Sequence, residues 1–160
     1  MADNVLFIES CSNHNSKIFD YNVIPRLREL SKSLIVIIDN TWRTHLIFNL
    51  FDYYADIIVM SLTKYYSGGT TIMGACIFNE TTKNIYDIAV KKNCYEGVHI
   101  SPIIAQHLNI MMNQMETRIV NNSELTIKVL KLLQKSKPKY YEKYTFTVIQ
   151  YRKQLSRQRL

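Results

Sequence analysis

Side chains that could bind and react together follow three short apolar stretches of the sequence, in each case where the stretch ends. They comprise one amide, one carboxylate, three hydroxyls and one lysine: Asn13, Asp39, Thr41, Ser61, Thr63 and Lys64. A lysine forms an imine with an aldehyde, a carboxylate balances a protonated pyridine nitrogen, and hydroxyls bind phosphate. The combination therefore suits a cofactor that carries an aldehyde, a pyridine ring and a phosphate.

The stretches that precede these side chains have the composition of β-strands. Leu34 to Ile38 is a run of mostly β-branched residues, which predicts a strand buried on both faces of a sheet. Val5 to Ile8, Asp56 to Ser61 and Met73 to Phe78 predict three further strands, and Pro25 opens a helix. This order predicts an α/β fold with a mostly parallel sheet. Because such sheets bind ligands at the carboxyl ends of their strands, we expect the six side chains to converge on one crevice.

The sequence becomes helical after the fourth predicted strand. Thr81 to Lys92 predicts one helix, and Ser101-Pro102 supplies the cap and first turn of a long one. Apolar residues then recur at helical spacing as far as Leu133, with a break expected around Asn121-Asn122. Lys137-Pro138 ends the pattern.

The net charge of +7 belongs to the end of the chain rather than to its body. Residues 131–160 carry nine Lys and Arg against one acid, whereas the first 130 residues carry eleven against twelve. We expect a folded part over residues 1–134 and a poorly packed basic tail over 135–160. The tail is also rich in tyrosine, a composition that could bind single-stranded nucleic acid, but nucleic acid is the less favoured partner.

Cysteine use and hydropathy favour a cytoplasmic location. The three cysteines are odd in number and lack paired spacing, so we expect reduced thiols. The N-terminus has no cationic segment of a signal peptide, and no apolar stretch is long enough to cross a bilayer, so no membrane partner is expected. The four histidines show no ligand spacing, so we expect no metal.

Three motifs occur in a fixed order along the chain and surround the candidate residues: Asp39-Asn40-Thr41, Ala55-Asp56-Ile57 and Ser61-Leu62-Thr63-Lys64-Tyr65. In this order they resemble the signature of the Cys/Met-metabolism, or trans-sulfuration, family of pyridoxal-phosphate-dependent enzymes. The segment from Glu9 to Asn13 and the segment from Met115 to Arg118 resemble further parts of the family. The resemblance runs from about Leu6 to Leu133.

The resemblance implies a role for each candidate residue toward pyridoxal 5'-phosphate. Lys64 would hold the cofactor covalently and later move the proton of the substrate Cα. Asp39 would pair with the pyridinium nitrogen of the ring. The other four would contact the rest of the cofactor: Ser61 and Thr63 its phosphate, Asn13 its phenolic oxygen and Thr41 its ring.

The resemblance also implies a fold and an activity. The chain would form part of the large domain of the type I pyridoxal-phosphate-dependent transferase fold, followed by the start of a long connecting helix. Trp42 and the Met73-Gly74-Ala75 turn resemble the bacterial cystathionine β-lyases of the family more than its γ-lyases. The implied reaction is β-elimination from a sulfur-containing amino acid, giving homocysteine, pyruvate and ammonia in methionine biosynthesis.

Several parts of the family pattern have no counterpart in this sequence. Family enzymes are more than twice as long, and no segment here matches their phosphate-binding glycine turn or the arginine for the substrate carboxylate. Locally, His14, Gly69 and Thr71 stand where the family has Pro, His and often Asp. Three alternatives therefore stay open: a homo-oligomeric lyase or one completed by a second chain, a truncated and catalytically incomplete fragment, and a nucleic-acid-binding module.

Overall fold

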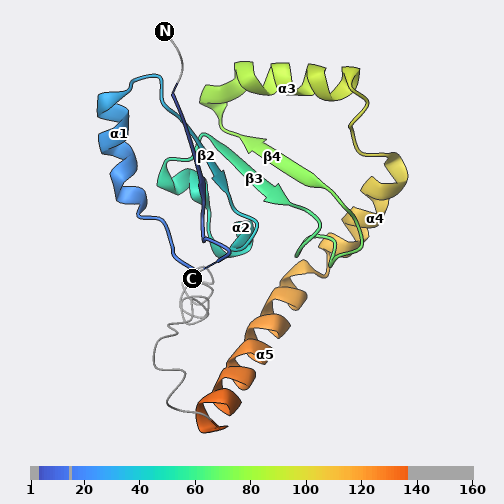
Figure 1. Cartoon of the computed structure of the whole chain (residues 1–160). Coiled ribbons are helices and arrows are strands. Elements are labelled where there is room, and N and C mark those ends of the chain that lie inside the picture. Colours follow the sequence, from blue (N-terminus) through green and yellow to red (C-terminus); the bar gives the residue numbers. More distant parts are fainter. Residues whose placement is uncertain (1–3, 15, 137–160) are drawn as a thin grey trace, which may run out of the picture.

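A computed structural model describes residues 4–14 and 16–136 and contains one four-stranded sheet. Its strands lie in the order β1 (Val5–Glu9), β2 (Ile35–Asp39), β3 (Ile57–Ser61) and β4 (Gly74–Phe78) (Figure 1). The first three strands are parallel, and β4 is antiparallel to β3. The predicted α/β fold with a mostly parallel sheet is confirmed.

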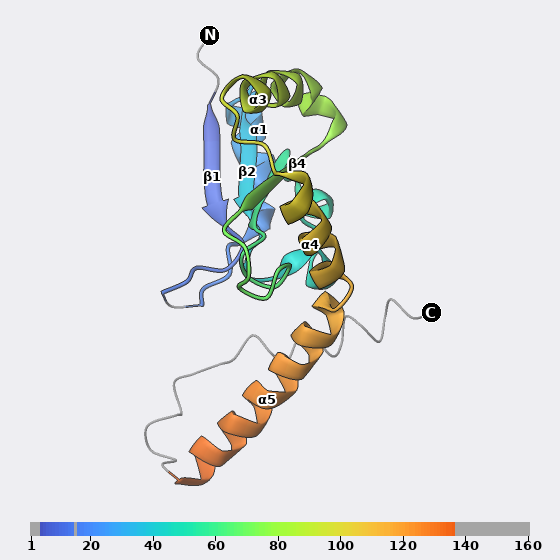
Figure 2. The ribbon, with the colours of Figure 1, turned by 90° about the vertical axis from the view of Figure 1, so that its right-hand side faces the viewer.

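Helices flank the sheet on the side of β1 and β2 and again beyond β4 (Figure 1). The α-helices are α1 (Ile24–Leu30), α2 (Thr44–Ile47), α3 (Lys83–Tyr95), α4 (Pro102–Met112) and α5 (Met115–Ser136). Three short 3-10 turns precede α1, β3 and α3: η1 (Tyr21–Val23), η2 (Leu50–Tyr53) and η3 (Glu80–Thr82). Figure 2 shows that α5 projects away from the sheet.

The hydrophobic core lies on one face of the sheet. Val36, Ile38 and Ile58 point to this face and are almost completely buried, together with residues of α1, α4 and α5. On the opposite face, Val5 and Phe7 of β1 are 58% and 60% exposed. The prediction that β2 is buried on both faces is therefore wrong for the described part of the chain, because its residues cover one face fully and leave the other half-buried.

The break in the C-terminal helical region lies earlier than predicted. α4 ends at Met112 and α5 begins at Met115, so Asn121-Asn122 falls inside α5. In a continuous helix the carbonyl of Met111 would accept the amide of Met115. Here that carbonyl accepts the amide of Gln114 at 3.2 Å and Arg118 Nη2 at 2.8 Å. This competing arginine contact is the physical reason for the displaced break.

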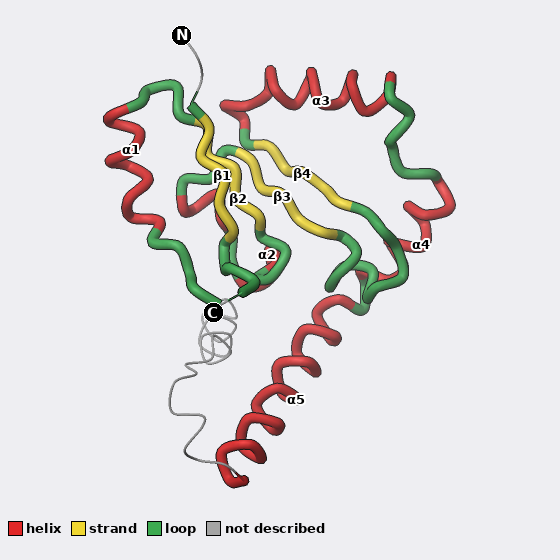
Figure 3. The backbone as a smooth tube through the Cα atoms, viewed as in Figure 1, coloured by secondary structure: helices red, strands yellow, loops and turns green. Residues whose placement is uncertain are grey.

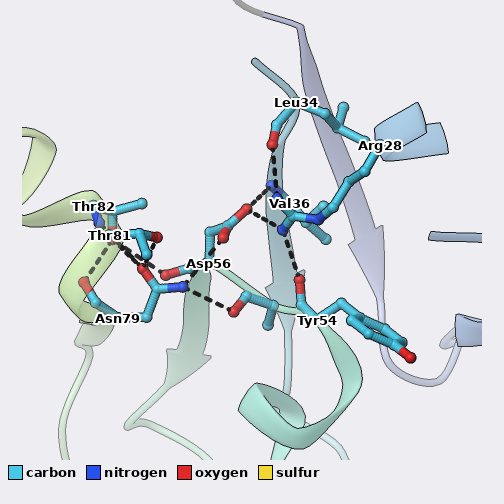
Figure 4. Close-up of polar contacts among 9 residues, drawn as sticks. Arg28, Leu34, Val36, Tyr54, Asp56, Asn79, Thr81 and Thr82 are labelled. Atoms are coloured by element: carbon cyan, nitrogen blue, oxygen red, sulfur yellow. Dashed lines mark hydrogen bonds and ion pairs between the residues drawn. The ribbon is translucent and has the colours of Figure 1, made fainter. Parts of the chain in front are cut away.

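Asp56 anchors the amino-terminal end of β3 (Figure 4). Its Oδ2 accepts Arg28 Nη2 at 2.7 Å and the amide of Val36 at 2.8 Å, and its Oδ1 accepts Asn79 Nδ2 at 3.1 Å. The Asp56 carbonyl also accepts the amide of Asn79. One buried carboxylate thus connects α1, β2 and the turn after β4. Although Asp56 belongs to one of the three motifs, its role in the structure is to hold the sheet together.

The last described helix, α5, ends beyond the predicted boundary of the folded part. α5 continues through Ser136, whereas the predicted folded part ends at residue 134. The remainder of the predicted basic tail, residues 137–160, lies outside the described residues. Among the helices that the structure describes, none combines the length and the apolar character that a membrane span requires.

Candidate functional site

A cavity of about 510 Å³ opens at the carboxyl ends of the parallel strands. Its lining contains five of the six side chains that the sequence singles out: Asn13, Asp39, Thr41, Ser61 and Lys64. The loops that leave β1, β2 and β3 lie at this same end of the sheet (Figure 3). Residues that are up to 51 positions apart in the sequence are thereby brought to one cavity, because parallel strands deliver their carboxyl ends to one edge.

Hydrogen bonds between the loops fix the carboxylate and two of the hydroxyl-bearing residues. One oxygen of Asp39 accepts the amide of Thr41 at 2.8 Å, which closes a tight turn after β2. The hydroxyl of Thr41 accepts the amide of Ser61 at 2.8 Å and so ties this turn to the end of β3. The second carboxylate oxygen of Asp39 has no hydrogen bond to any described residue and remains available to a ligand.

Lys64 lies in the turn that follows β3. Its side chain is exposed and makes no hydrogen bond or ion pair within the described ranges. The turn is compact, because the amides of Ser67, Gly68 and Gly69 donate back to the carbonyls of residues 62, 64 and 63. Gly68 and Gly69 have φ values of +63° and +86°, a region that glycine enters without strain. The Gly-Gly pair thus permits the fold that presents Lys64 to the cavity.

Thr63 is the one predicted site residue that does not line the cavity. Its hydroxyl accepts the amide of Met73 at 3.0 Å and lies 3.4 Å from the Met73 carbonyl. The side chain therefore connects the Lys64 turn to the segment that enters β4. Its predicted contact with phosphate stays a prediction.

Three further residues line the cavity without having been predicted: Glu9, Trp42 and Tyr65. Glu9 pairs with Asp39 in the sheet register, so the two carboxylates end neighbouring strands. The strand-end rule that selects Asp39 would also have selected Glu9, since both are the last residue of a strand. Trp42 is 50% exposed and Tyr65 directly follows the lysine, so both place aromatic surface beside the polar groups.

Tyr66, a buried residue of the Lys64 turn, pairs with the partly exposed His45. His45 Nδ1 and the hydroxyl of Tyr66 are 2.9 Å apart, and their rings stack with centroids at 5.8 Å. Burial lowers the pKa of His45 from its ordinary value of 6.5. Burial also raises the pKa of Tyr66, although the hydrogen bond from His45 opposes this. Both shifts favour the neutral forms of the two side chains.

This pair predicts a specific dependence of stability on pH. The unfolded chain takes up a proton on His45 near pH 6.5, whereas the folded chain does so only at lower pH. Between these values the unfolded state binds more protons, so the free energy of unfolding falls as the pH drops below about 6.5. We expect His45→Gln to flatten this part of the profile, as measured by urea unfolding between about pH 5 and 8. The assignment is contradicted if His45→Gln shows the same slope of unfolding free energy against pH as the unmodified protein. His99→Gln, at an exposed histidine, is the matched control.

The donor set of the cavity fits the cofactor that the sequence suggests. An amine, a free carboxylate oxygen and a strand-end hydroxyl come from Lys64, Asp39 and Ser61. These groups match an aldehyde, a protonated pyridine nitrogen and a phosphate in turn. The volume also falls within the range of about 300 to 1,000 Å³ that is common for small-molecule sites.

Comparison with known proteins gives the same family from the sequence. The model of the family described as Cys/Met metabolism PLP-dependent enzyme matches residues 2–154. An L-methionine gamma-lyase from Fusobacterium nucleatum is 32% identical over 133 residues, which cover 82% of this chain and 33% of that enzyme. A cystathionine beta-lyase from Haemophilus influenzae is 27% identical over 131 residues, covering 81% and 32%. The chain thus spans about a third of the length of these curated relatives.

Solved structures show the same fold. A methionine gamma lyase from Micromonospora echinospora superposes with a TM-score of 0.69 at 16% identity, over 80% of this chain and 35% of that one. A cystathionine gamma synthase from Xanthomonas oryzae superposes with a TM-score of 0.68 at 21% identity, over 79% and 33%. The predicted membership of the type I pyridoxal-phosphate fold is confirmed for the described part of the chain.

Proposed function

Because the chain belongs to the family of Cys/Met metabolism PLP-dependent enzymes, we propose that its cavity holds pyridoxal 5'-phosphate on Lys64. The family uses this cofactor for the metabolism of sulfur amino acids. The observation that carries the proposal is the convergence of Asp39, Ser61 and Lys64 on one cavity at the carboxyl ends of three parallel strands. Family membership alone would not require a chain of this length to keep that convergence.

Each lining residue would hold one part of the cofactor. Lys64 Nζ would hold the cofactor through its aldehyde carbon, whose oxygen would leave as water, and the free oxygen of Asp39 would pair with the ring nitrogen. Ser61 would donate its hydroxyl to the phosphate, and Asn13 would donate its amide to the phenolic oxygen. The Thr41 hydroxyl already accepts the amide of Ser61, so Thr41 would act mainly by fixing the end of β3 beside the ring.

The proposed chemistry is proton transfer at the substrate Cα followed by cleavage of a carbon–sulfur bond. When bound, the cofactor supplies an electron sink that stabilises negative charge at the Cα. Lys64 Nζ would take the Cα proton, while Asp39 would keep the ring nitrogen protonated. In β-elimination the electron pair of the Cα–H bond forms the Cα–Cβ double bond and the thiolate leaves from Cβ. The remaining enamine hydrolyses to pyruvate and ammonia.

The relatives indicate the substrate class. Which carbon–sulfur bond is broken is a separate proposal. Proteins similar to this chain are named cystathionine beta-lyase and L-methionine gamma-lyase, so a carbon–sulfur lyase acting on a sulfur amino acid is the shared activity. We propose β-elimination from cystathionine, on the basis of Trp42 and the Met73-Gly74-Ala75 sequence, which forms the start of β4 and not the predicted turn. Trp42 supports this choice because its half-exposed ring lines the cavity.

The length of the chain bears on how the site would be completed. The chain spans about a third of its relatives, and the face of β1 that carries Val5 and Phe7 is open to solvent. We propose that a second copy of the chain, or a complementing polypeptide, supplies the remaining contacts to the substrate carboxylate. A cytoplasmic location belongs to the same proposal, since sulfur amino acids and the cofactor are available there.

The activity is tested by offering two substrates to the purified protein with added pyridoxal phosphate. We expect cystathionine to yield homocysteine, pyruvate and ammonia in equal amounts, and methionine to react more slowly. Products are separated by liquid chromatography and identified by mass spectrometry, which distinguishes homocysteine from cysteine and pyruvate from 2-oxobutyrate. The exposed Lys91→Arg variant serves as the control and should match the unmodified protein. Formation of 2-oxobutyrate instead of pyruvate would contradict β-elimination, and no product from either substrate would contradict an activity of this chain alone.

A further inference from the structure

We propose that Arg118, from the first turn of α5, is the positioning residue that holds the Lys64 turn in the shape required for cofactor attachment. The inference rests on the proposed function of Lys64. Arg118 Nη2 lies 2.7 Å from the Tyr65 carbonyl and 2.8 Å from the Tyr66 carbonyl, and its Nε lies 3.3 Å from the Tyr65 carbonyl. These are the two peptide carbonyls that immediately follow Lys64.

The contacts complete the hydrogen bonding of the turn. The carbonyls of residues 62, 63 and 64 accept the amides of Ser67, Gly69 and Gly68, so the first half of the turn closes on itself. The next two carbonyls, of Tyr65 and Tyr66, accept from Arg118. A turn whose carbonyls are all paired has few alternative backbone conformations. The direction of the Lys64 and Tyr65 side chains, both of which line the cavity, is therefore set from α5.

The guanidinium is itself held in place from several sides. Arg118 Nη2 also contacts the Met111 carbonyl at the end of α4, at 2.8 Å. Met115 and Ile119, which flank Arg118 in α5, are 2% and 3% exposed, so the helix turn that carries the arginine is anchored in the core. Arg118 Nη1 is buried without a hydrogen-bond partner among the described residues, which costs free energy, so the contacts of Nη2 and Nε must outweigh this penalty to keep the guanidinium in place.

The turn also packs closely against the arginine. A Cβ added at Gly68 would lie 3.5 Å from Arg118 Nε and 3.6 Å from its Cδ, which is ordinary contact distance. A second contact follows one residue beyond Gly69, where the hydroxyl of Thr70 is 2.8 Å from His107 Nε2 of α4. The segment after Lys64 is thus held by α4 and α5 together. Arg118 makes the larger contribution, because a charged donor forms stronger hydrogen bonds than a neutral one.

Hydrogen exchange of the turn tests the contact without any cofactor. In the full chain we expect Arg118→Met to speed exchange of the amides of Ser67, Gly68 and Gly69 by about tenfold or more, the loss expected when charged hydrogen bonds to a turn disappear. Arg118→Lys should restore part of the protection.

Two arginine variants serve as controls for Arg118→Met. Arg26→Met removes an exposed arginine of α1, and Arg28→Met breaks the pair with Asp56 at the opposite end of β3. Neither should change exchange in the turn beyond its effect on global unfolding.

Cofactor labelling then tests positioning. Each protein is mixed with pyridoxal phosphate, reduced with borohydride at timed intervals, and the adduct on Lys64 is quantified by peptide mass spectrometry. We expect the rate of Lys64 labelling to fall about tenfold in Arg118→Met, to recover in part in Arg118→Lys, and to be unchanged in Arg26→Met.

A loss of labelling rate in Arg28→Met as large as in Arg118→Met would overturn the inference, because general destabilisation would explain both. Normal labelling of Arg118→Met would overturn it while leaving the cofactor site intact. Failure of the unmodified protein to label at Lys64 would instead overturn the proposed function, and the inference with it.

Discussion

The Lys64→Arg protein is expected to lose covalent retention of pyridoxal phosphate completely. Arginine keeps the positive charge but does not form an imine with the aldehyde, so noncovalent attraction to the phosphate is preserved and covalent attachment is not. Lys64 is exposed and unpaired within the described residues, and a surface substitution of this kind changes the free energy of unfolding by less than about 0.5 kcal/mol. The loss would therefore report on chemistry rather than on folding.

The measurement is the absorbance of cofactor that stays with the protein after desalting. Lys91→Arg is the matched control, because Lys91 is an exposed lysine of α3, away from the cavity. We expect the control to retain cofactor as the unmodified protein does. Equal retention by Lys64→Arg would mean that another lysine carries the cofactor, and the cavity would lose its assigned role.

Asp56→Asn is expected to lower the free energy of unfolding by about 3 kcal/mol. The carboxylate uses both oxygens as acceptors: Oδ2 for Arg28 and the amide of Val36, and Oδ1 for Asn79 (Figure 4). Asparagine replaces one oxygen with an NH₂ group. In either orientation, the NH₂ group of asparagine faces a hydrogen-bond donor that the carboxylate oxygen accepted. Buried groups are therefore left unpaired.

Urea unfolding measures this loss, and the same substitution at an exposed ion pair provides the control. Asp87 pairs with Lys83 one turn away on α3, with half of the Asp87 side chain exposed. Such pairs contribute about 0.5 kcal/mol or less, so Asp87→Asn should unfold almost as the unmodified protein does. Comparable losses in the two variants would show that the Asp56 network is no stronger than a surface pair.

The sequence was sufficient to predict the strands and most of the candidate site, because both depend on local patterns. β-branched runs gave the strand positions to within a residue or two at most ends, and the strand-end rule placed Asp39, Ser61 and Lys64 in one cavity. The same rule could have selected Glu9, which ends β1 beside Asp39. Glu9 was missed because the predicted strand ends at Ile8, which assigns Glu9 to the polar loop instead of to the strand end.

The features that the sequence did not predict depend on contacts between distant residues. Arg118 meets the Tyr65 carbonyl across 53 positions of the chain, and the same arginine contact shifts the helix break to residues 113–114. Asp56 reaches Arg28 and Val36 across 28 and 20 positions. No local pattern of polar residues distinguishes such an arginine or aspartate from one on the surface. The half-open face of the sheet was missed for the same reason, since a β-branched run does not show what covers it.

The central claim is that the cavity keeps a working cofactor lysine, and peptide mapping of the unmodified protein tests it most directly. The full chain is saturated with pyridoxal phosphate, reduced with borohydride and digested, and every lysine-containing peptide is quantified by mass spectrometry. We predict one adduct per chain, on Lys64, with the other lysines almost unlabelled. Labelling spread over many lysines, the basic segment after residue 130 included, would contradict the claim, and so would a chain that takes up no label at all.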